Sequence, residues 1–250
     1  MEALILAAGY ATRLGELTQQ RAKPLLPIGS KPMIDYIFCQ LADMPEVRRV
    51  NVVSNAKFAA QFNDWAAGHG SSTPISVIND GTSSDADKLG AVGDIRLVID
   101  GNGIDDDLLV VAGDNLFDFR LQDFVDFFHS HGTSVGLYDT GDLEIMKQYA
   151  VVELDSFGER VTDFLEKPRE PSSTLAATCI YLWRREHLPL VEQYSGNMDA
   201  PGHYVQWLTK QVDVYGFCIP GGWRDIGNPE QYADACRQYA VADASASVAG

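Results

Sequence analysis

Short apolar runs alternate with segments of helical periodicity through the first half of the chain. The runs lack the alternation of polar and apolar positions found in half-exposed strands, and their length suits strands buried on both faces. The predicted strands cover residues 3–8, 50–53, 75–78 and 108–112, and the predicted helices include residues 33–41 and 58–67. Strands that alternate with helices in this way predict an α/β fold with a largely parallel sheet.

The pattern changes in the second half. Residues 149–154 and 160–165 have the character of strands, and the turn residues 155–158 separate them, as in a β-hairpin. Two more strands are predicted over residues 177–183 and 212–219. Because a hairpin joins antiparallel strands, we expect the central sheet to become mixed here.

The chain has 250 residues, of which 46% are hydrophobic, and this suffices for one compact domain with a full core. We therefore predict a single domain over residues 1–240. The last ten residues are small or polar and predict a flexible tail over residues 241–250.

Acidic residues dominate the composition. The net charge of −16 repels polyanions, which argues against nucleic acid or an anionic membrane as partner and favours a small molecule. The cysteines lie far apart without a C-x-x-C motif, so they indicate neither a zinc site nor a disulfide framework. No apolar run approaches the ~18 residues of a membrane span. A cytoplasmic location is expected.

A long connection follows the first predicted strand. Residues 9–32 exceed an ordinary strand-to-helix loop, which favours a functional role. Residues 3–34 hold four basic side chains and one acidic side chain, a local charge of +3 on an acidic protein. A glycine turn with such a charge suits a polyphosphate, although a solvated basic loop has the same composition.

Two other phosphate-binding loops do not fit this segment. A dinucleotide-binding loop needs G-x-G-x-x-G, but the residues at the second and third glycine positions after Gly9 are Ala11 and Leu14. The sequence also lacks the G-x-x-x-x-G-K-[ST] motif of P-loop NTPases.

The segments LAAGYATRL, LTQQRAKPLLPI and SKPMI resemble the signature of the sugar-1-phosphate nucleotidylyltransferase family, also called NDP-sugar pyrophosphorylases. The resemblance implies a Rossmann-like three-layer sandwich with a mostly parallel, mixed central sheet. It implies that residues 1–135 mainly bind the nucleotide and residues 136–240 mainly bind the sugar phosphate. It also implies an enzyme that joins a sugar 1-phosphate to a nucleoside triphosphate and releases pyrophosphate.

The same resemblance assigns residues to the nucleotide and the metal. Arg13 and Lys23 are the implied catalytic residues, which hold the triphosphate, and Asp114 and Asp225 are the implied ligands of Mg²⁺. The implied nucleotide-binding residues are Leu6, Ala8, Gly9, Tyr10, Ala11, Thr12, Arg13, Lys23, Asn79, Gly90 and Asp114. Ala11 replaces a glycine that is usual in the family, so the loop must either have a negative φ there or be slightly strained.

The sugar phosphate is assigned to the second half. The implied contacts are Tyr149, Ala150, Glu166, Lys167 and Thr178, and Ala150 replaces a usual glycine. Glu166 would accept hydrogen bonds from sugar hydroxyls and Lys167 would donate to the phosphate. Family frequency favours glucose 1-phosphate with dTTP or UTP. A cytidylyltransferase of a non-sugar phosphate such as phosphocholine, or a catalytically silent nucleotide-sugar-binding protein, is the alternative. Both a monomer and a homo-oligomer fit.

Overall fold

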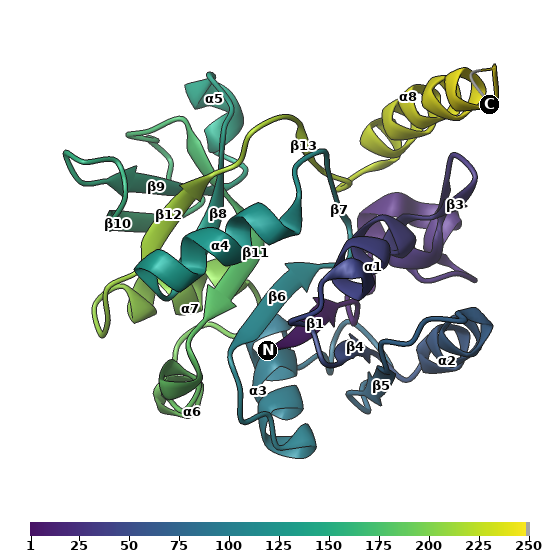
Figure 1. Ribbon diagram of the computed structural model, residues 1–250, viewed down its shortest axis with the longest axis horizontal. Coiled ribbons are helices and arrows are strands. Elements are labelled where there is room, and N and C mark those ends of the chain that lie inside the picture. The colour runs from purple at the N-terminus through teal and green to yellow at the C-terminus, as the bar shows by residue number, and fades with distance from the viewer. Residues whose placement is uncertain (249–250) are drawn as a thin grey trace.

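A twisted sheet with helices on both faces forms the centre of the molecule (Figure 1). The computed structural model describes the backbone of residues 1–248 and the side chains of residues 1–240. Within this part of the chain nine strands form the main sheet, with β10-β9-β11-β6-β1-β4-β5 as its path and β8 pairing with β11 and β12. They are β1 (Glu2–Leu6), β4 (Val50–Ser54), β5 (Ile75–Asn79), β6 (Leu108–Ala112), β8 (Ser134–Asp139), β9 (Ala150–Leu154), β10 (Val161–Glu166), β11 (Leu175–Trp183) and β12 (Tyr215–Cys218).

The sheet is parallel in its first part and mixed in its second, as predicted. Strand β1 pairs in parallel with β4 and β6, and β4 pairs in parallel with β5. Strand β11 then runs antiparallel to β6, and β9 and β10 form the predicted hairpin. Two smaller ribbons complete the strands: β2 (Pro27–Ile28) with β3 (Lys31–Pro32), and β7 (Asn115–Phe117) with β13 (Trp223–Asp225).

Alternate residues of β1 pack on opposite faces of the sheet because side chains in a strand alternate. Ala3 and Ile5 belong to one buried cluster, and Leu4 belongs to another. The first cluster includes side chains of α1 (Met33–Asp43), α2 (Ala59–Gly68), α4 (Leu121–His131) and α5 (Leu143–Met146). The second includes side chains of α3 (Ala91–Asn102), α6 (Leu190–Gln193) and α7 (Pro201–Leu208). The result is the implied three-layer sandwich.

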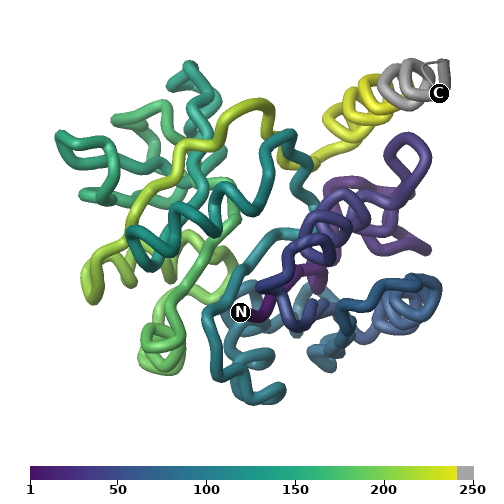
Figure 2. The backbone as a smooth tube through the Cα atoms, in the orientation of Figure 1, coloured from purple at the N-terminus to yellow at the C-terminus, as the bar shows by residue number. Residues whose placement is uncertain are grey.

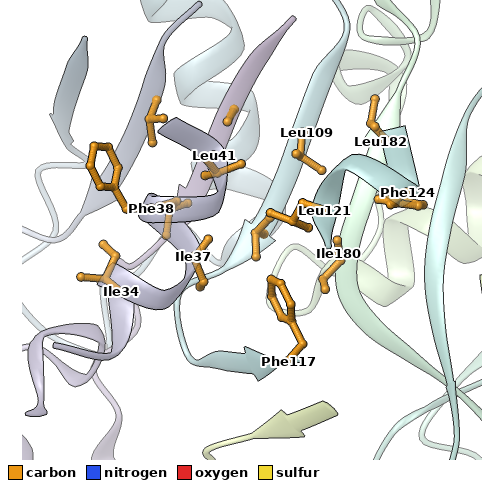
Figure 3. Close-up of a cluster of buried hydrophobic side chains, with 14 of the residues drawn as sticks. Ile34, Ile37, Phe38, Leu41, Leu109, Phe117, Leu121, Phe124, Ile180 and Leu182 are labelled. Atoms are coloured by element: carbon orange, nitrogen blue, oxygen red, sulfur yellow. The ribbon is translucent and has the colours of Figure 1, made fainter. Parts of the chain in front are cut away.

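Figure 3 shows the first cluster, in which two helices pack on the sheet. Ile34, Ile37, Phe38 and Leu41 all project from one side of α1, because positions three and four apart share a helix face. The other labelled side chains come from α4 and from strands β6, β7 and β11: Leu121, Phe124, Leu109, Phe117, Ile180 and Leu182. This packing joins both halves of the chain in one core.

The first part of the C-terminal helix α8 (Pro229–Val248), drawn in yellow, lies beside the purple amino-terminal part of the chain (Figure 2). Tyr232 donates a hydrogen bond from Oη to the carbonyl oxygen of Pro27 at 2.7 Å, and the ring of Tyr239 meets Tyr36 edge to face. The helix continues through residues 241–248, where we expected a tail, and residues 249–250 lie outside the described residues. Flexibility of this segment stays a prediction.

Helix α8 is also the longest helix that the structure describes, yet neither it nor any other helix in residues 1–248 combines the length and apolar character required to span a bilayer. Three short 3₁₀ helices complete the fold, at Thr12–Thr18, Lys23–Leu25 and Arg185–His187. The first two lie in the long basic loop and shape the site.

Candidate active site

A cavity of about 530 Å³ opens at the carboxyl ends of β1 and β6. These parallel strands lie side by side at the centre of the sheet, and their ends are where ligands bind in open α/β sheets. The wall is built from both halves of the chain. Among the predicted site residues it includes Leu6, Ala8, Gly9, Tyr10, Ala11, Thr12, Arg13, Lys23, Gly90, Asp114, Tyr149, Lys167, Thr178 and Asp225.

The basic loop turns sharply at Ala11, which is left-handed with φ 49° and ψ 39°. The carbonyl oxygen of Ala11 accepts hydrogen bonds from the Leu14 amide at 3.0 Å and from Thr18 Oγ1 at 3.1 Å. These bonds hold the turn that leads into the 3₁₀ helix carrying Arg13. The loop therefore adopts the strained alternative of the two expected for an alanine at this position.

Lys23 lies at the start of the second 3₁₀ helix and is only 9% exposed. Its Nζ contacts Asp114 Oδ2 at 2.5 Å. Asp114 follows Gly113, whose amide donates to the carbonyl oxygen of Leu6 at 2.9 Å. A Cβ at position 113 would lie 3.0 Å from this oxygen and from Pro24 Cγ, so a glycine lets the loop approach β6 closely.

Asp225 is brought to the same wall by the short ribbon of β7 and β13, in which it lies opposite Asn115. Burial and the nearby Asp114 carboxylate raise the pKa of Asp225 to about 6, although Lys23, Arg13 and Lys167 oppose this shift. A buried carboxylate next to a second carboxylate favours a bound cation.

Asp114 and Asp225 suit a divalent metal ion whose other ligands do not come from protein side chains. Among the side chains of residues 1–240, no group of three or more His, Cys, Asp or Glu gathers as a metal cage. Mg²⁺ is commonly held by one or two carboxylates together with phosphate oxygens and water. Asp114 and Asp225 match this kind of donor set.

Tyr149 and Lys167 lie on the hairpin side of the cavity. Burial and the Asp225 carboxylate raise the pKa of the Tyr149 phenol, and its ring meets Trp223 edge to face at 5.4 Å. The Lys167 amide donates to the carbonyl oxygen of Tyr149 at 3.2 Å. Lys167 has a φ of 46°, and its ammonium is more than half exposed, so it remains available to an anion.

All the non-glycine residues with positive φ in residues 1–248 line this cavity: Ala11, Lys167 and Cys179. Left-handed backbone costs a residue with a Cβ roughly 1–2 kcal/mol, so it persists only where surrounding structure enforces it. Such conformations concentrate at functional sites. Sequence reasoning did not identify Cys179, since only its backbone conformation sets it apart.

Three of the predicted site residues do not line the cavity. Asn79 is exposed, and its Oδ1 accepts from the Gly81 amide in a turn. Ala150 is buried opposite Glu166 in the hairpin. The Glu166 carboxylate is largely buried against Gly202 at the start of α7, with Lys167 Nζ at 3.7 Å. Thr178 does line the wall, but its hydroxyl donates to the carbonyl oxygen of Gly136 at 2.9 Å.

Several polar residues of the wall were not predicted. Asp80, rather than its neighbour Asn79, faces the cavity after β5. Lys88 bridges to Asp199 with Nζ and Oδ1 2.8 Å apart, which connects the two halves of the chain across the cavity. Asp94, in the first turn of α3, also contributes to the wall. Its position four residues after the Gly90 turn is the feature of the sequence that could have indicated a place in the wall.

The chain was compared with known proteins. A model of the family described as nucleotidyl transferase matches residues 2–241. Mannose-1-phosphate guanylyltransferase 1 of Arabidopsis thaliana is 26% identical over 244 residues, covering 96% of this chain and 64% of that protein. The bifunctional protein GlmU of Methanocaldococcus jannaschii is 25% identical over 240 residues, covering 94% and 53%. The chain thus spans between half and two thirds of the length of these relatives.

Solved structures share the fold. A crystal structure of UDP-glucose pyrophosphorylase complexed with UDP-glucose superposes with a TM-score of 0.80 at 19% identity, and the match covers 95% of this chain and 97% of that one. Its architecture agrees with the sandwich described above. The family match extends over nearly the whole chain and includes the loop, both carboxylates and the hairpin. The chain therefore belongs to the nucleotidyl transferase family.

Proposed function

We propose that this protein is a sugar-1-phosphate nucleotidylyltransferase, which forms an NDP-sugar and pyrophosphate from a sugar 1-phosphate and a nucleoside triphosphate. One observation carries the proposal. The cavity that holds the carboxylates of Asp114 and Asp225 is lined by four cationic side chains, of which Lys88 is paired with Asp199. The other three are Arg13, Lys23 and Lys167. This is the charge pattern needed to bring two phosphorylated anions and a divalent cation together.

The reaction requires little proton transfer from the protein. A phosphate oxygen of the sugar 1-phosphate is already anionic near neutral pH and attacks the α-phosphorus of the triphosphate without a strong base. None of the histidines lines the cavity. Catalysis then depends on holding the reactants in line and stabilising the charge that develops on the leaving pyrophosphate.

The cationic residues divide this work by position. Arg13 and Lys23, on the basic loop, bind the triphosphate and stabilise the departing pyrophosphate. Lys167, on the hairpin side, binds the phosphate of the sugar. Tyr149 forms the wall next to Asp225 and limits the room for water.

The metal belongs to the same proposal. Asp114 and Asp225 would hold Mg²⁺, which when bound supplies positive charge to the phosphate oxygens. Lys23 is the partner of Asp114 in the structure, so it prevents the two carboxylates from facing each other without a neutralising charge.

The identities of the sugar and of the nucleotide are decided by experiment. The resemblance favours glucose 1-phosphate with dTTP or UTP, whereas the name of the Arabidopsis relative specifies mannose 1-phosphate and guanylyl transfer. The deciding experiment is a matrix of GTP, UTP, dTTP, ATP and CTP against glucose 1-phosphate, mannose 1-phosphate and phosphocholine, with Mg²⁺ and a pyrophosphate readout. Product with at least one sugar phosphate supports the proposal. Turnover of phosphocholine alone, or no turnover with any pair, contradicts it.

A further inference from the structure

The part of the cavity wall that follows β5 is acidic, and the proposed reaction assigns no role to its residues. Asp80 follows β5, and Asp94 lies in the first turn of α3. In the sheet, β5 is three strands away from β6, which leads into Asp114. At 4.7–4.9 Å per strand this is a distance of ~14 Å. A nucleotide with its phosphates at Lys23 can therefore direct its base, the part most distant from the phosphates, towards Asp80 and Asp94.

Asp94 has an unused hydrogen-bond acceptor in this wall. The residue is 7% exposed, and its Oδ1 is one of two buried side-chain atoms within residues 1–240 that have no hydrogen-bond partner. Burial and the adjacent Asp80 carboxylate, with which it shares a hydrogen bond, raise the pKa of Asp94 to about 7. A residue of the cavity wall thus has a buried carboxyl oxygen without a donor, and a proton on Asp94 would lie between two neighbouring carboxyl groups.

Asp80 is fixed in place by its neighbours. Its Oδ1 accepts from the Thr82 amide at 2.7 Å and from Thr82 Oγ1 at 2.8 Å, and Thr82 Oγ1 also lies 3.0 Å from the hydroxyl of Tyr10. The salt bridges of Lys88, a lysine of this wall, go to Asp85 and Asp199. Thr82 therefore holds the Asp80 carboxylate in place, and the salt bridges of Lys88 are made with other acids.

We propose that Asp94 and Asp80 recognise the nucleobase and select guanine. Ionised carboxylates only accept hydrogen bonds. Guanine has two adjacent donors, N1–H and the 2-amino group, which would replace the shared proton and satisfy Asp94 Oδ1. Uracil and thymine have one N–H between two carbonyl oxygens that the carboxylates would repel. In adenine and cytosine, a ring nitrogen that accepts lies next to the amino group.

This inference rests on the proposed function and replaces the expectation of dTTP or UTP. A site built to bind two donors discriminates against a base that lacks one of them, because a buried acceptor is then left without a partner. Inosine triphosphate (ITP) is the matched probe, since its base is guanine without the 2-amino group.

The test measures kcat/KM with GTP, ITP, UTP and dTTP for the wild type, Asp94→Asn and the control Asp100→Asn. Asp100 is an exposed acid near the far end of the same helix and outside the cavity wall, so the control makes the same substitution away from the site. In the wild type we expect GTP to exceed ITP by about 10- to 100-fold, as for loss of a hydrogen bond to a charged group. Asp94→Asn should reduce this ratio to within about 3-fold, mainly by lowering the value for GTP, and Asp100→Asn should preserve it.

Calorimetric titration of the wild type and both variants with GTP and ITP in the presence of Mg²⁺ measures the same discrimination without turnover. A wild type that binds ITP as tightly as GTP, that prefers UTP or dTTP, or whose GTP-to-ITP ratio survives Asp94→Asn overturns the inference. If GTP binds selectively and Asp94→Asn abolishes the selectivity, but no sugar phosphate reacts, the guanine inference holds and the proposed function fails.

Discussion

Lys23 and Asp114 form a close ion pair in the cavity, where solvent screening is weak because Lys23 is mostly buried. The ammonium neutralises one of two neighbouring carboxylates. In the proposed function it also presents a positive charge to a phosphate. Replacement of this residue therefore affects the bound state and the transition state more than it affects the distant core.

We predict that Lys23→Met lowers kcat/KM at least a hundredfold, by analogy with the loss of an oriented charged donor. Methionine retains the apolar stem and removes the charge. Arg21→Met is the control, because Arg21 lies in the same basic loop but is exposed and outside the cavity wall. Thermal unfolding should show both variants folded. Near-native activity of folded Lys23→Met would remove the catalytic role.

Ala11 has a left-handed backbone that glycine adopts without strain. We predict that Ala11→Gly stabilises the protein by about 0.5–1 kcal/mol, since relief of the strain exceeds the added entropy of the unfolded chain. Urea unfolding measures the change. Gly15→Ala in the same loop is the opposite control: this glycine has φ 57° and open space around it, so the substitution adds strain without a clash. Destabilisation by Ala11→Gly would contradict the conformation described for Ala11.

The pKa of Asp94 gives a pH-dependent contribution to stability. Because its folded-state pKa is raised from 3.8 to about 7, the folded protein binds this proton more tightly than the unfolded chain. The resulting stabilisation is complete below about pH 4 and is lost as the pH rises to about 7, by up to about 4 kcal/mol. Asp94→Asn lacks this dependence, so its Tm relative to the wild type should increase between pH 5 and pH 8. A constant difference in Tm would contradict the shifted pKa.

At the scale of elements, the start of α3 connects the first half of the chain to the second half. The amides of Ala91 and Val92 donate to the carbonyl oxygens of Asp199 and Met198 at 3.3 and 3.0 Å. Gly90 precedes this turn with φ 76°, and a Cβ there would collide with the Met198 carbonyl group. The close approach of two backbones therefore depends on this glycine.

Two glycines of this region should respond in opposite ways to the same substitution. Gly90→Ala combines a disfavoured φ with a collision against backbone, and we expect it to destabilise the protein by more than about 2 kcal/mol and to reduce activity. Gly101→Ala lies within α3 and faces open space, so it should stabilise by about 0.5–1 kcal/mol. Denaturant unfolding of both variants checks the signs. Equal effects would contradict the assigned helix start.

Sequence patterns predicted the elements better than the cavity wall. Strand β6 has the predicted bounds, Leu108–Ala112, because its residues form an uninterrupted apolar run between polar ones. Strand β12 is shorter than predicted, Tyr215–Cys218, since the apolar residues at either side pack without joining the ladder. Asp80 was missed in favour of Asn79, because a turn after a strand decides which neighbour faces the cavity. Local patterns do not encode that choice.

At the scale of the whole molecule, the sheet makes the two halves interdependent. Strand β11 from the second half lies between β6 and β9, and it also pairs with β8. The nucleotide half alone would therefore expose one edge of β6, a strand whose side chains are buried on both faces. The division of ligand contacts at residue 135 stays a prediction, and the two halves share a common core.

We predict that residues 1–240 unfold in a single cooperative transition and that a fragment of residues 1–135 has none. The fragment loses the antiparallel partner of β6 and the side chains that β11 adds to the core. Circular dichroism in increasing urea tests both chains, with coincident near-UV and far-UV curves as the criterion for the longer one. Cooperative unfolding of the short fragment would instead show that the halves are separate domains.

The clustering of Ala11, Lys167 and Cys179 around one cavity also matters for protein engineering. A search for heat-resistant variants would begin with residues whose backbone prefers another conformation. Within residues 1–248, all such positions with a side chain line the candidate active site. Gains in heat resistance at these positions carry the greatest risk for turnover, because relaxed backbone can shift the groups that align the phosphates. Substitutions in helices, such as Gly101→Ala in α3, can raise thermal stability without disturbing the residues of the cavity.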